Sequence, residues 1–144
     1  VALVGELGAG KTTFVRGLGR GLELDEAVAS PTFTRMRALS GRLALYHFDA
    51  WRGGAEALFA EGAEFLAGDG VAVVEWADRV EAYLPAPRAE LTFAHRGASV
   101  RELEARLIAP ANGAGARERE LHAALARALR LAGSCAGLEL QSAR

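Results

Sequence analysis

The chain has 144 residues, of which 51% are hydrophobic and 24% are charged, and its formal net charge at pH 7 is −1. These values are ordinary for one globular domain with a buried core; they exclude a disordered or fibrous chain and give no overall electrostatic attraction to nucleic acids or membranes. Cys135 is the only cysteine, which excludes an intrachain disulfide, and without a signal-peptide pattern or a long apolar stretch we expect a cytoplasmic protein.

The first predicted elements are a strand, a glycine-rich loop and a helix. Residues 1–4, VALV, form the unbroken apolar run that is typical of a buried parallel strand. The stretch GELGAGKT at residues 5–12 matches the pattern G-x-x-x-x-G-K-[ST]. Apolar residues then recur at helical spacing from Phe14 to Leu22, although interior glycines weaken this helix and predict that it is short. The sequence therefore predicts a phosphate-binding loop in its usual context.

Each residue type in this loop meets a physical demand of phosphate binding. Glycines allow the backbone to turn its N–H groups toward phosphate oxygens. Lys11 is the only lysine among 17 basic residues, and its compact ammonium group on a flexible stem suits a β- or γ-phosphate. Thr12 and Thr13 open the helix, whose positive end faces the phosphates, and the Thr12 hydroxyl can bind Mg²⁺.

The next segment, residues 28–34, is predicted to be a loop because Pro31 disfavours helical conformation at Ser30. Its hydroxyl groups, from Ser30, Thr32 and Thr34, could bind phosphate or a metal-bound water, as the switch segments of nucleotide hydrolases do. A plain connecting turn into a strand is an equal alternative.

Two later strands are each predicted to end on a carboxylate. A turn at Ser40 and Gly41 precedes a strand over residues 42–48 that ends on Asp49, and the apolar run at residues 71–74 ends on Glu75. Because parallel strands share their carboxyl edge with the phosphate loop, we expect both acids to converge on Lys11 and Thr12.

These two acids have different predicted roles. Asp49 suits Mg²⁺, which needs only a carboxylate and a hydroxyl beside the phosphates and retains several waters. Glu75 could hold a metal-bound water or polarise an attacking one. For either acid alone, the alternative is a helix cap or a surface carboxylate.

Neighbouring side chains offer weaker signals. We interpret His47 as a core residue rather than as a ligand or base. Arg52 and Arg79 are interpreted as surface charges rather than phosphate contacts. Trp76 directly follows Glu75, and Trp51 closely follows Asp49. For both tryptophans, aromatic core is the default interpretation, with base stacking or a partner surface as the alternative.

The remaining pattern completes the sheet and adds a C-terminal segment. We predict a helix over residues 56–67, a strand over 91–95 and a half-buried strand over 103–107. Residues 111–116 form a predicted flexible linker, and residues 117–132 form an amphipathic helix with leucines on one stripe. This helix either packs back on the domain or binds a partner, and packing is favoured.

Four motifs together resemble one family. GELGAGKTTFVRG, SPTFT, YHFDAWR and VVEWADR, in this order, are similar to the TsaE (YjeE) family, bacterial ATPases needed to make threonylcarbamoyladenosine in tRNA. The resemblance covers residues 1–108, a P-loop ATPase domain, and leaves residues 109–144 as a linker and C-terminal amphipathic helical extension. It implies an α/β fold, P-loop NTPase-like, with a mainly parallel sheet flanked by helices in three layers.

Two departures from the family pattern accompany this resemblance. Trp51 stands where the family usually has tyrosine, and the family's upstream helix and strand do not appear before Val1. We therefore expect further residues to precede this sequence.

The resemblance also implies a site for ATP and Mg²⁺. It gives Lys11, Asp49 and Glu75 catalytic roles, and Thr12, Asp49 and Glu75 metal-associated roles. The implied nucleotide-binding residues are Gly5, Glu6, Leu7, Gly8, Ala9, Gly10, Lys11, Thr12, Thr13, Thr32 and Trp76. The implied partners are TsaD and TsaB, which modify adenosine 37 of tRNA, so contact with tRNA would be indirect.

Other nucleotide-dependent functions compete with this interpretation. A GTPase is disfavoured, because its Asn-Lys-x-Asp element needs a lysine other than Lys11, and Asn112 is the only asparagine. A small-molecule kinase would need an acceptor pocket and an arginine-bearing lid, which the sequence does not clearly show. A third class, a nucleotide-gated interaction module with negligible turnover, shares its sequence pattern with a slow ATPase, and product release measured with and without TsaB and TsaD distinguishes the two.

Overall fold

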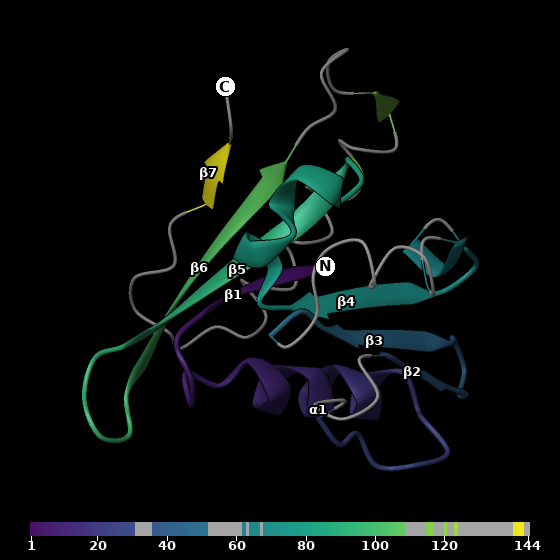
Figure 1. Cartoon of the computed structure of the whole chain (residues 1–144), viewed down its shortest axis with the longest axis horizontal. Coiled ribbons are helices and arrows are strands. Elements are labelled where there is room, and N and C mark those ends of the chain that lie inside the picture. Colours follow the sequence, from purple (N-terminus) through teal and green to yellow (C-terminus); the bar gives the residue numbers. More distant parts are fainter. Residues whose placement is uncertain are drawn as a thin grey trace.

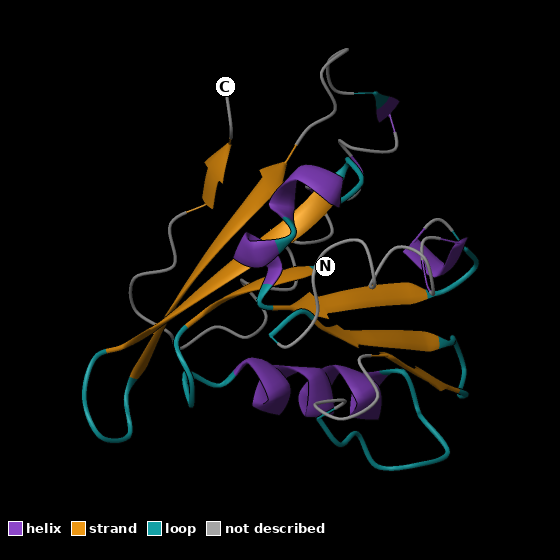
Figure 2. Ribbon diagram, in the orientation of Figure 1, coloured by secondary structure: helices purple, strands orange, loops and turns teal. Residues whose placement is uncertain are grey.

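The computed structural model describes residues 1–30, 36–51, 62, 64–66, 68–108, 115–116, 120, 123 and 140–142. The first half contains β1 (Ala2–Gly5), α1 (Lys11–Gly21), β2 (Met36–Leu39), β3 (Leu45–Asp49) and β4 (Val71–Glu75). The second half contains the short 3₁₀ helices η1 (Ala77–Arg79) and η2 (Glu81–Tyr83), then β5 (Arg88–His95), β6 (Arg101–Ile108) and β7 (Leu140–Ser142). Figures 1 and 2 show these elements.

The described strands form one seven-stranded sheet in the order β2-β3-β4-β1-β5-β6-β7. Its centre is parallel, because β3 pairs with β4, and β1 pairs with both β4 and β5 in parallel. β2 and β6 are antiparallel to β3 and β5, while β7 runs parallel to β6. The predicted mainly parallel α/β sheet is confirmed. The carboxyl ends of β1, β3 and β4 consequently lie at one edge.

Alternating side chains place a hydrophobic core on each face of this sheet. On one face, Leu3, Leu45 and Val73 pack with Val15 of α1. On the other face lies a second cluster that includes the first turn after β4; its buried members are Ala2, Phe48, Ala50, Val74, Ala77 and Val80. Figure 2 shows α1 apart from the short helices, with β3 and β4 between them. This arrangement confirms the predicted three layers.

Several predicted boundaries differ from the structure. β3 begins at Leu45 rather than at Arg42, because the Arg42 N–H group donates to the Leu22 carbonyl and not to a neighbouring strand. β5 begins earlier than predicted, at Arg88. The short edge strands β2 and β7 were not predicted from the sequence.

Other expectations fall largely on residues outside the described part of the chain. Gly62 and residues 64–66 are helical, in agreement with the predicted helix over 56–67, whose remaining positions are not described. The predicted linker and amphipathic helix at residues 111–132 are described at only a few positions. Within the described ranges, no helix is both long enough and apolar enough to cross a bilayer.

Candidate functional site

The loop between β1 and α1 has the backbone shape that its glycines predict. Gly5 adopts a φ of 142°, and a Cβ atom there would lie 2.5 Å from the carbonyl oxygen of Phe93 on β5. Gly10 has a φ of 112° and caps α1, with its carbonyl accepting from the Phe14 N–H group. Side chains other than glycine are disfavoured at both positions, so the sheet and the helix together fix the path of the loop.

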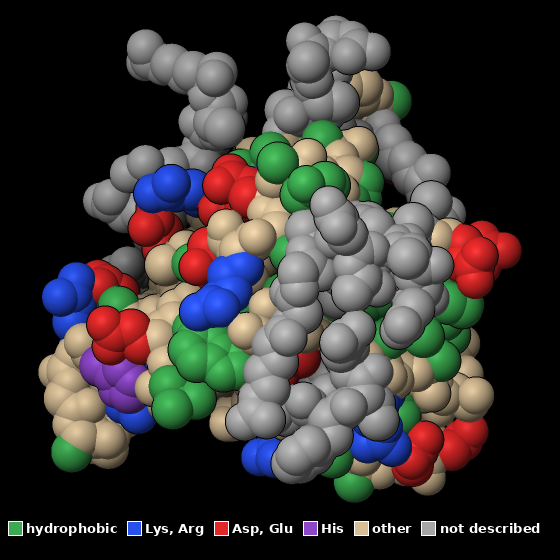
Figure 3. All heavy atoms as spheres, in the orientation of Figure 1, with side chains coloured by type: hydrophobic (Ala, Val, Ile, Leu, Met, Phe, Trp, Pro, Cys, Tyr) green, Lys and Arg blue, Asp and Glu red, His purple; other side chains and the backbone are tan. Residues whose placement is uncertain are grey.

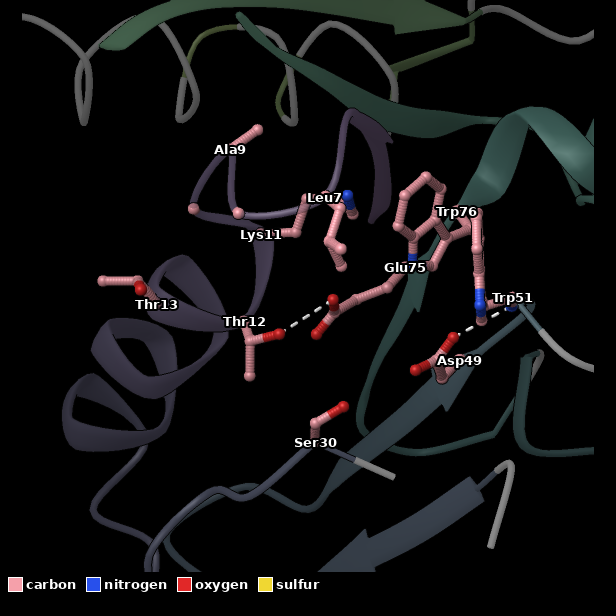
Figure 4. Close-up of a pocket in the computed structure, with 12 residues that line it drawn as sticks. Leu7, Ala9, Lys11, Thr12, Thr13, Ser30, Asp49, Trp51, Glu75 and Trp76 are labelled. Carbon is pink, nitrogen blue, oxygen red and sulfur yellow. Dashed lines mark hydrogen bonds between the residues drawn. The ribbon is translucent and has the colours of Figure 1, made fainter. Parts of the chain in front are cut away.

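The N-terminus of α1 opens into a pocket of about 350 Å³. The first turn of α1 contains no acidic residue, so the positive end of the helix dipole is not neutralised by its own side chains. The residues around the pocket come from the loop, the start of α1, the segment after α1 and the ends of β3 and β4 (Figure 4): they are Leu7, Gly8, Ala9, Gly10, Lys11, Thr12, Thr13, Ser30, Asp49, Trp51, Glu75 and Trp76. This is the geometry of an anion-binding site.

Lys11 is held by the loop itself. The side chain is only 4% exposed, and its Nζ donates to the carbonyl oxygens of Gly5 at 2.6 Å and Glu6 at 2.9 Å. The Nζ also lies 3.5 Å from the centroid of the Trp76 ring. Burial lowers the Lys11 pKa from 10.5, while nearby carboxylates oppose that shift. Gly5 and Glu6, two predicted nucleotide-binding residues, therefore contact Lys11 rather than line the pocket.

The two predicted acids meet at the carboxyl edge, as expected. Asp49 and Glu75 are register partners at the ends of β3 and β4, and both are buried. The Thr12 hydroxyl donates to Glu75 Oε2 at 2.9 Å (Figure 4). The Trp51 N–H group donates to Asp49 Oδ1 at 2.9 Å. The predicted convergence of these acids on the start of α1 is confirmed, whereas Thr13 points away from Glu75 in Figure 4.

His47 is fully buried, which agrees with its interpretation as a core residue, but it also reaches the site. Its Nε2 lies 2.8 Å from Glu75 Oε1. The sequence contained a signal for the face of His47, although not for its contact with Glu75. His47 precedes Asp49 by two residues, so on a strand both side chains lie on the same face.

The two tryptophans form an aromatic pair beside the pocket. Their ring centroids are 4.3 Å apart, and Trp51 is 39% exposed. The Arg79 guanidinium lies 4.1 Å from the Trp51 ring centroid, and Arg79 donates to the Trp51 carbonyl at 3.1 Å. The default interpretation of aromatic core is therefore wrong for Trp51. Arg79 is exposed, as predicted, but stacks on an aromatic ring; Arg52 lies outside the described residues.

The segment after α1 is seen only in part. Ser30 lines the pocket, whereas Thr32 and Thr34 lie outside the described residues, so the predicted contact of Thr32 with a nucleotide remains a prediction.

The side chains around the pocket fit a hard cation that is shared with a phosphate. Thr12, Asp49 and Glu75 supply only oxygen atoms, which Mg²⁺ prefers. In the described residues, no group of three or more His, Cys, Asp and Glu side chains could hold a metal alone. A metal here would need phosphate oxygens and water to complete its shell.

Comparison with known proteins decides the family. The family model described as threonylcarbamoyl adenosine biosynthesis protein TsaE matches residues 1–103. The chain belongs to the TsaE family. The structure is also similar to the crystal structure of Bacillus subtilis YdiB, with a TM-score of 0.64 and 35% identity, covering 88% of this chain and 76% of that chain. This similarity confirms the P-loop NTPase-like fold.

Two relatives with the name tRNA threonylcarbamoyladenosine biosynthesis protein TsaE show the extent of the match. The Treponema pallidum protein is 49% identical over 87 residues, which are 59% of this chain and 64% of the relative. The Bacillus subtilis protein is 40% identical over 104 residues, 72% of this chain and 66% of the relative. The chain thus spans just under two thirds of the length of these relatives.

Proposed function

We propose that this chain is a cytoplasmic ATPase of the TsaE type. It binds and slowly hydrolyses Mg-ATP, and it supports TsaD and TsaB in forming N6-threonylcarbamoyladenosine at position 37 of tRNA. The observation that carries the proposal is the convergence of the phosphate loop, Lys11, Thr12, Asp49 and Glu75 on one pocket. Membership of the TsaE family supports the pathway.

Phosphate binding would use the loop backbone, the start of α1 and Lys11. In the structure, the Lys11 ammonium is satisfied by the carbonyls of Gly5 and Glu6 and by the Trp76 ring. Phosphate oxygens offer the same ammonium stronger, charge-assisted bonds. We therefore expect Lys11 to exchange at least one of these carbonyls for a phosphate oxygen when ATP binds.

Thr12 and Asp49 would hold Mg²⁺ beside the phosphates. When bound, this ion neutralises the charge that develops on the β- and γ-phosphate oxygens. The Thr12 hydroxyl is oriented by Glu75 Oε2, while Asp49 is oriented by the Trp51 backbone. Each candidate ligand is therefore held in place by a partner before any metal arrives.

Glu75 would act on the attacking water. Its side chain is buried at the edge of the pocket, where a carboxylate can orient a water molecule and accept its proton. Its contact with Thr12 also keeps it close to the proposed metal, so it could instead hold a metal-bound water. Both roles depend on the charged carboxylate.

The chain alone should hydrolyse ATP slowly. No arginine side chain is among the described residues that line the pocket, and a positioned arginine raises turnover by about 10³ to 10⁵ in enzymes that use one. Partners that complete or order the site would raise the rate. On the face seen in Figure 3, the described residues show acidic and basic side chains mixed rather than a basic patch, and indirect contact with tRNA fits this face.

The test is ATP hydrolysis by the chain alone and with TsaB and TsaD, and the Glu75→Gln variant with the same partners is the control for contaminating activity. We expect partners to raise turnover by about tenfold or more, and ATP to strengthen their binding, because such coupling is reciprocal. Fast hydrolysis by the chain alone, with partner binding indifferent to ATP, would contradict the proposal. Phosphate transfer to a small metabolite would instead favour a small-molecule kinase.

A further inference from the structure

We propose that His47 is a positioning residue for Glu75: its Nε2–H group holds Glu75 Oε1 so that Oε2 stays directed at Thr12 and the pocket. This inference rests on the proposed function of Glu75 in ATP hydrolysis. It assigns a role to a side chain that does not line the pocket itself.

The contact is short and sealed from solvent. His47 Nε2 lies 2.8 Å from Glu75 Oε1, and the two side chains are 0% and 4% exposed. The parallel register of β3 and β4 creates this contact, because His47 pairs with Val73 and its side chain reaches diagonally to Glu75. A shift of one residue in that register would move His47 to the other face.

The hydrogen-bond partners of the two ring nitrogens of His47 indicate which nitrogen carries the proton. Nδ1 is buried and has no hydrogen-bond partner among the described residues, whereas Nε2 faces a carboxylate oxygen. A neutral imidazole carries one N–H group, and an unprotonated Nε2 would set its lone pair against a carboxylate oxygen only 2.8 Å away. The proton therefore belongs on Nε2, where it is donated to Glu75.

Because of this bond, the two carboxylate oxygens of Glu75 accept from two different donors. Oε1 accepts from His47, and Oε2 accepts from the Thr12 hydroxyl in the pocket. With both oxygens fixed, the carboxylate plane cannot rotate freely about its last side-chain bond. Without His47, Oε1 would be buried without this donor, and the carboxylate would lose a constraint on its orientation.

Simple core packing does not account for this choice of residue. His47 lies on the same face of β3 as Leu45, next to the apolar Val73 of β4, where an aliphatic side chain would fill space without burying polar atoms. The one polar contact that the described residues provide to the ring is Glu75. The ring is thus a polar residue in an apolar layer with a single partner in the site.

The experiment compares three substitutions in the complete chain with TsaB and TsaD. His47→Leu removes the donor, His47→Gln keeps an N–H donor with similar reach, and His47→Asn keeps an amide that is too short to reach Oε1. We expect kcat to fall about tenfold or more for the Leu and Asn variants and to stay within about threefold of wild type for the Gln variant. ATP affinity, measured by calorimetry, should stay within about twofold in all three, because the change acts on hydrolysis.

If His47→Leu fails to fold, the comparison of His47→Gln with His47→Asn still tests the inference, because these two amide side chains differ mainly in length. Equal loss of kcat in the Gln and Asn variants, or wild-type kcat in the Leu and Asn variants, would overturn the inference. Glu75→Gln serves as the reference. If Glu75→Gln is inactive while Leu and Asn at position 47 are fully active, the inference fails and the proposed function stands. If Glu75→Gln itself hydrolyses ATP at the wild-type rate, the proposed function fails as well.

Discussion

The edge of β3 and β4 and the hairpin of β5 and β6 both pair an acidic with a basic side chain at the same distance, but in different surroundings. His47 Nε2 lies 2.8 Å from Glu75, and Arg106 Nε lies 2.8 Å from Glu104. The first pair is 0% and 4% exposed, and the second is 46% and 36% exposed. Distance alone therefore does not distinguish a site from a surface pair.

The difference in burial changes what each pair means. An exposed ion pair gains little, because water solvates both charges and the side chains lose freedom. A buried carboxylate is costly unless hydrogen bonds satisfy it, and Glu75 is satisfied by His47 and Thr12. A buried acid that opens onto a pocket is the stronger indicator of function.

The largest expected effect is at the buried edge. We expect Glu75→Gln to lower ATP hydrolysis by about 100-fold or more, because an amide cannot accept a proton from water. ATP affinity should change by less than about threefold, since the amide keeps the shape of the side chain. Steady-state hydrolysis and calorimetry measure the two effects. A variant that turns over like wild type would remove Glu75 from catalysis.

Lys11→Ala should act on binding. We expect ATP affinity to fall about 10- to 100-fold, the range for loss of a hydrogen bond to a charged group. The fold should survive, because Gly5 against Phe93 and Gly10 at the start of α1 fix the path of the loop without the lysine side chain. Arg106→Ala removes an equal charge from the exposed pair and is the matched control. Near-unchanged affinity of the Lys11→Ala variant for ATP would count against the site.

Asp49→Ala should act through the metal. We expect affinity for ATP to fall about tenfold in Mg²⁺, which corresponds to about 1.4 kcal/mol, and to change little in EDTA. Calorimetry under the two conditions separates these outcomes. An equal loss with and without Mg²⁺ would show that Asp49 does not hold the ion.

The smallest effect belongs to the hairpin. Glu104→Gln or Arg106→Ala should change the free energy of unfolding by less than about 1 kcal/mol and leave ATP hydrolysis at the wild-type rate. Denaturant unfolding measures the first quantity. A larger loss of stability, or a loss of ATP hydrolysis, would contradict the claim that only the buried pair of β3 and β4 matters for function.

Sequence could predict the loop and the two acids because each depends on local pattern. The G-x-x-x-x-G-K-[ST] motif fixes Lys11 and Thr12, and a strand that ends on an acid places Asp49 and Glu75 at the shared edge of a parallel sheet. The contact between His47 and Glu75 could not be predicted, because it depends on the register of β3 against β4. That register is a property of the assembled sheet.

The contact between Trp51 and Trp76 was not predicted, for a different reason. Trp76 adopts a φ of 59°, a left-handed conformation that is uncommon for residues other than glycine. It begins the turn into η1, and its indole ring lies over Lys11 and against Trp51. Two tryptophans that are far apart in the sequence indicate neither such a turn nor their contact, so the default of a buried core failed at Trp51.

The central claim is that one pocket binds Mg-ATP through Lys11, Thr12 and Asp49. The most direct measurement is a crystal structure of the chain with Mg²⁺ and a non-hydrolysable ATP analogue. We predict that Lys11 Nζ contacts a β- or γ-phosphate oxygen and that Mg²⁺ lies about 2.1 Å from Thr12 Oγ1. An analogue bound elsewhere, or bound here while Lys11 keeps both of its carbonyl partners and Thr12 contacts no metal, would contradict the account.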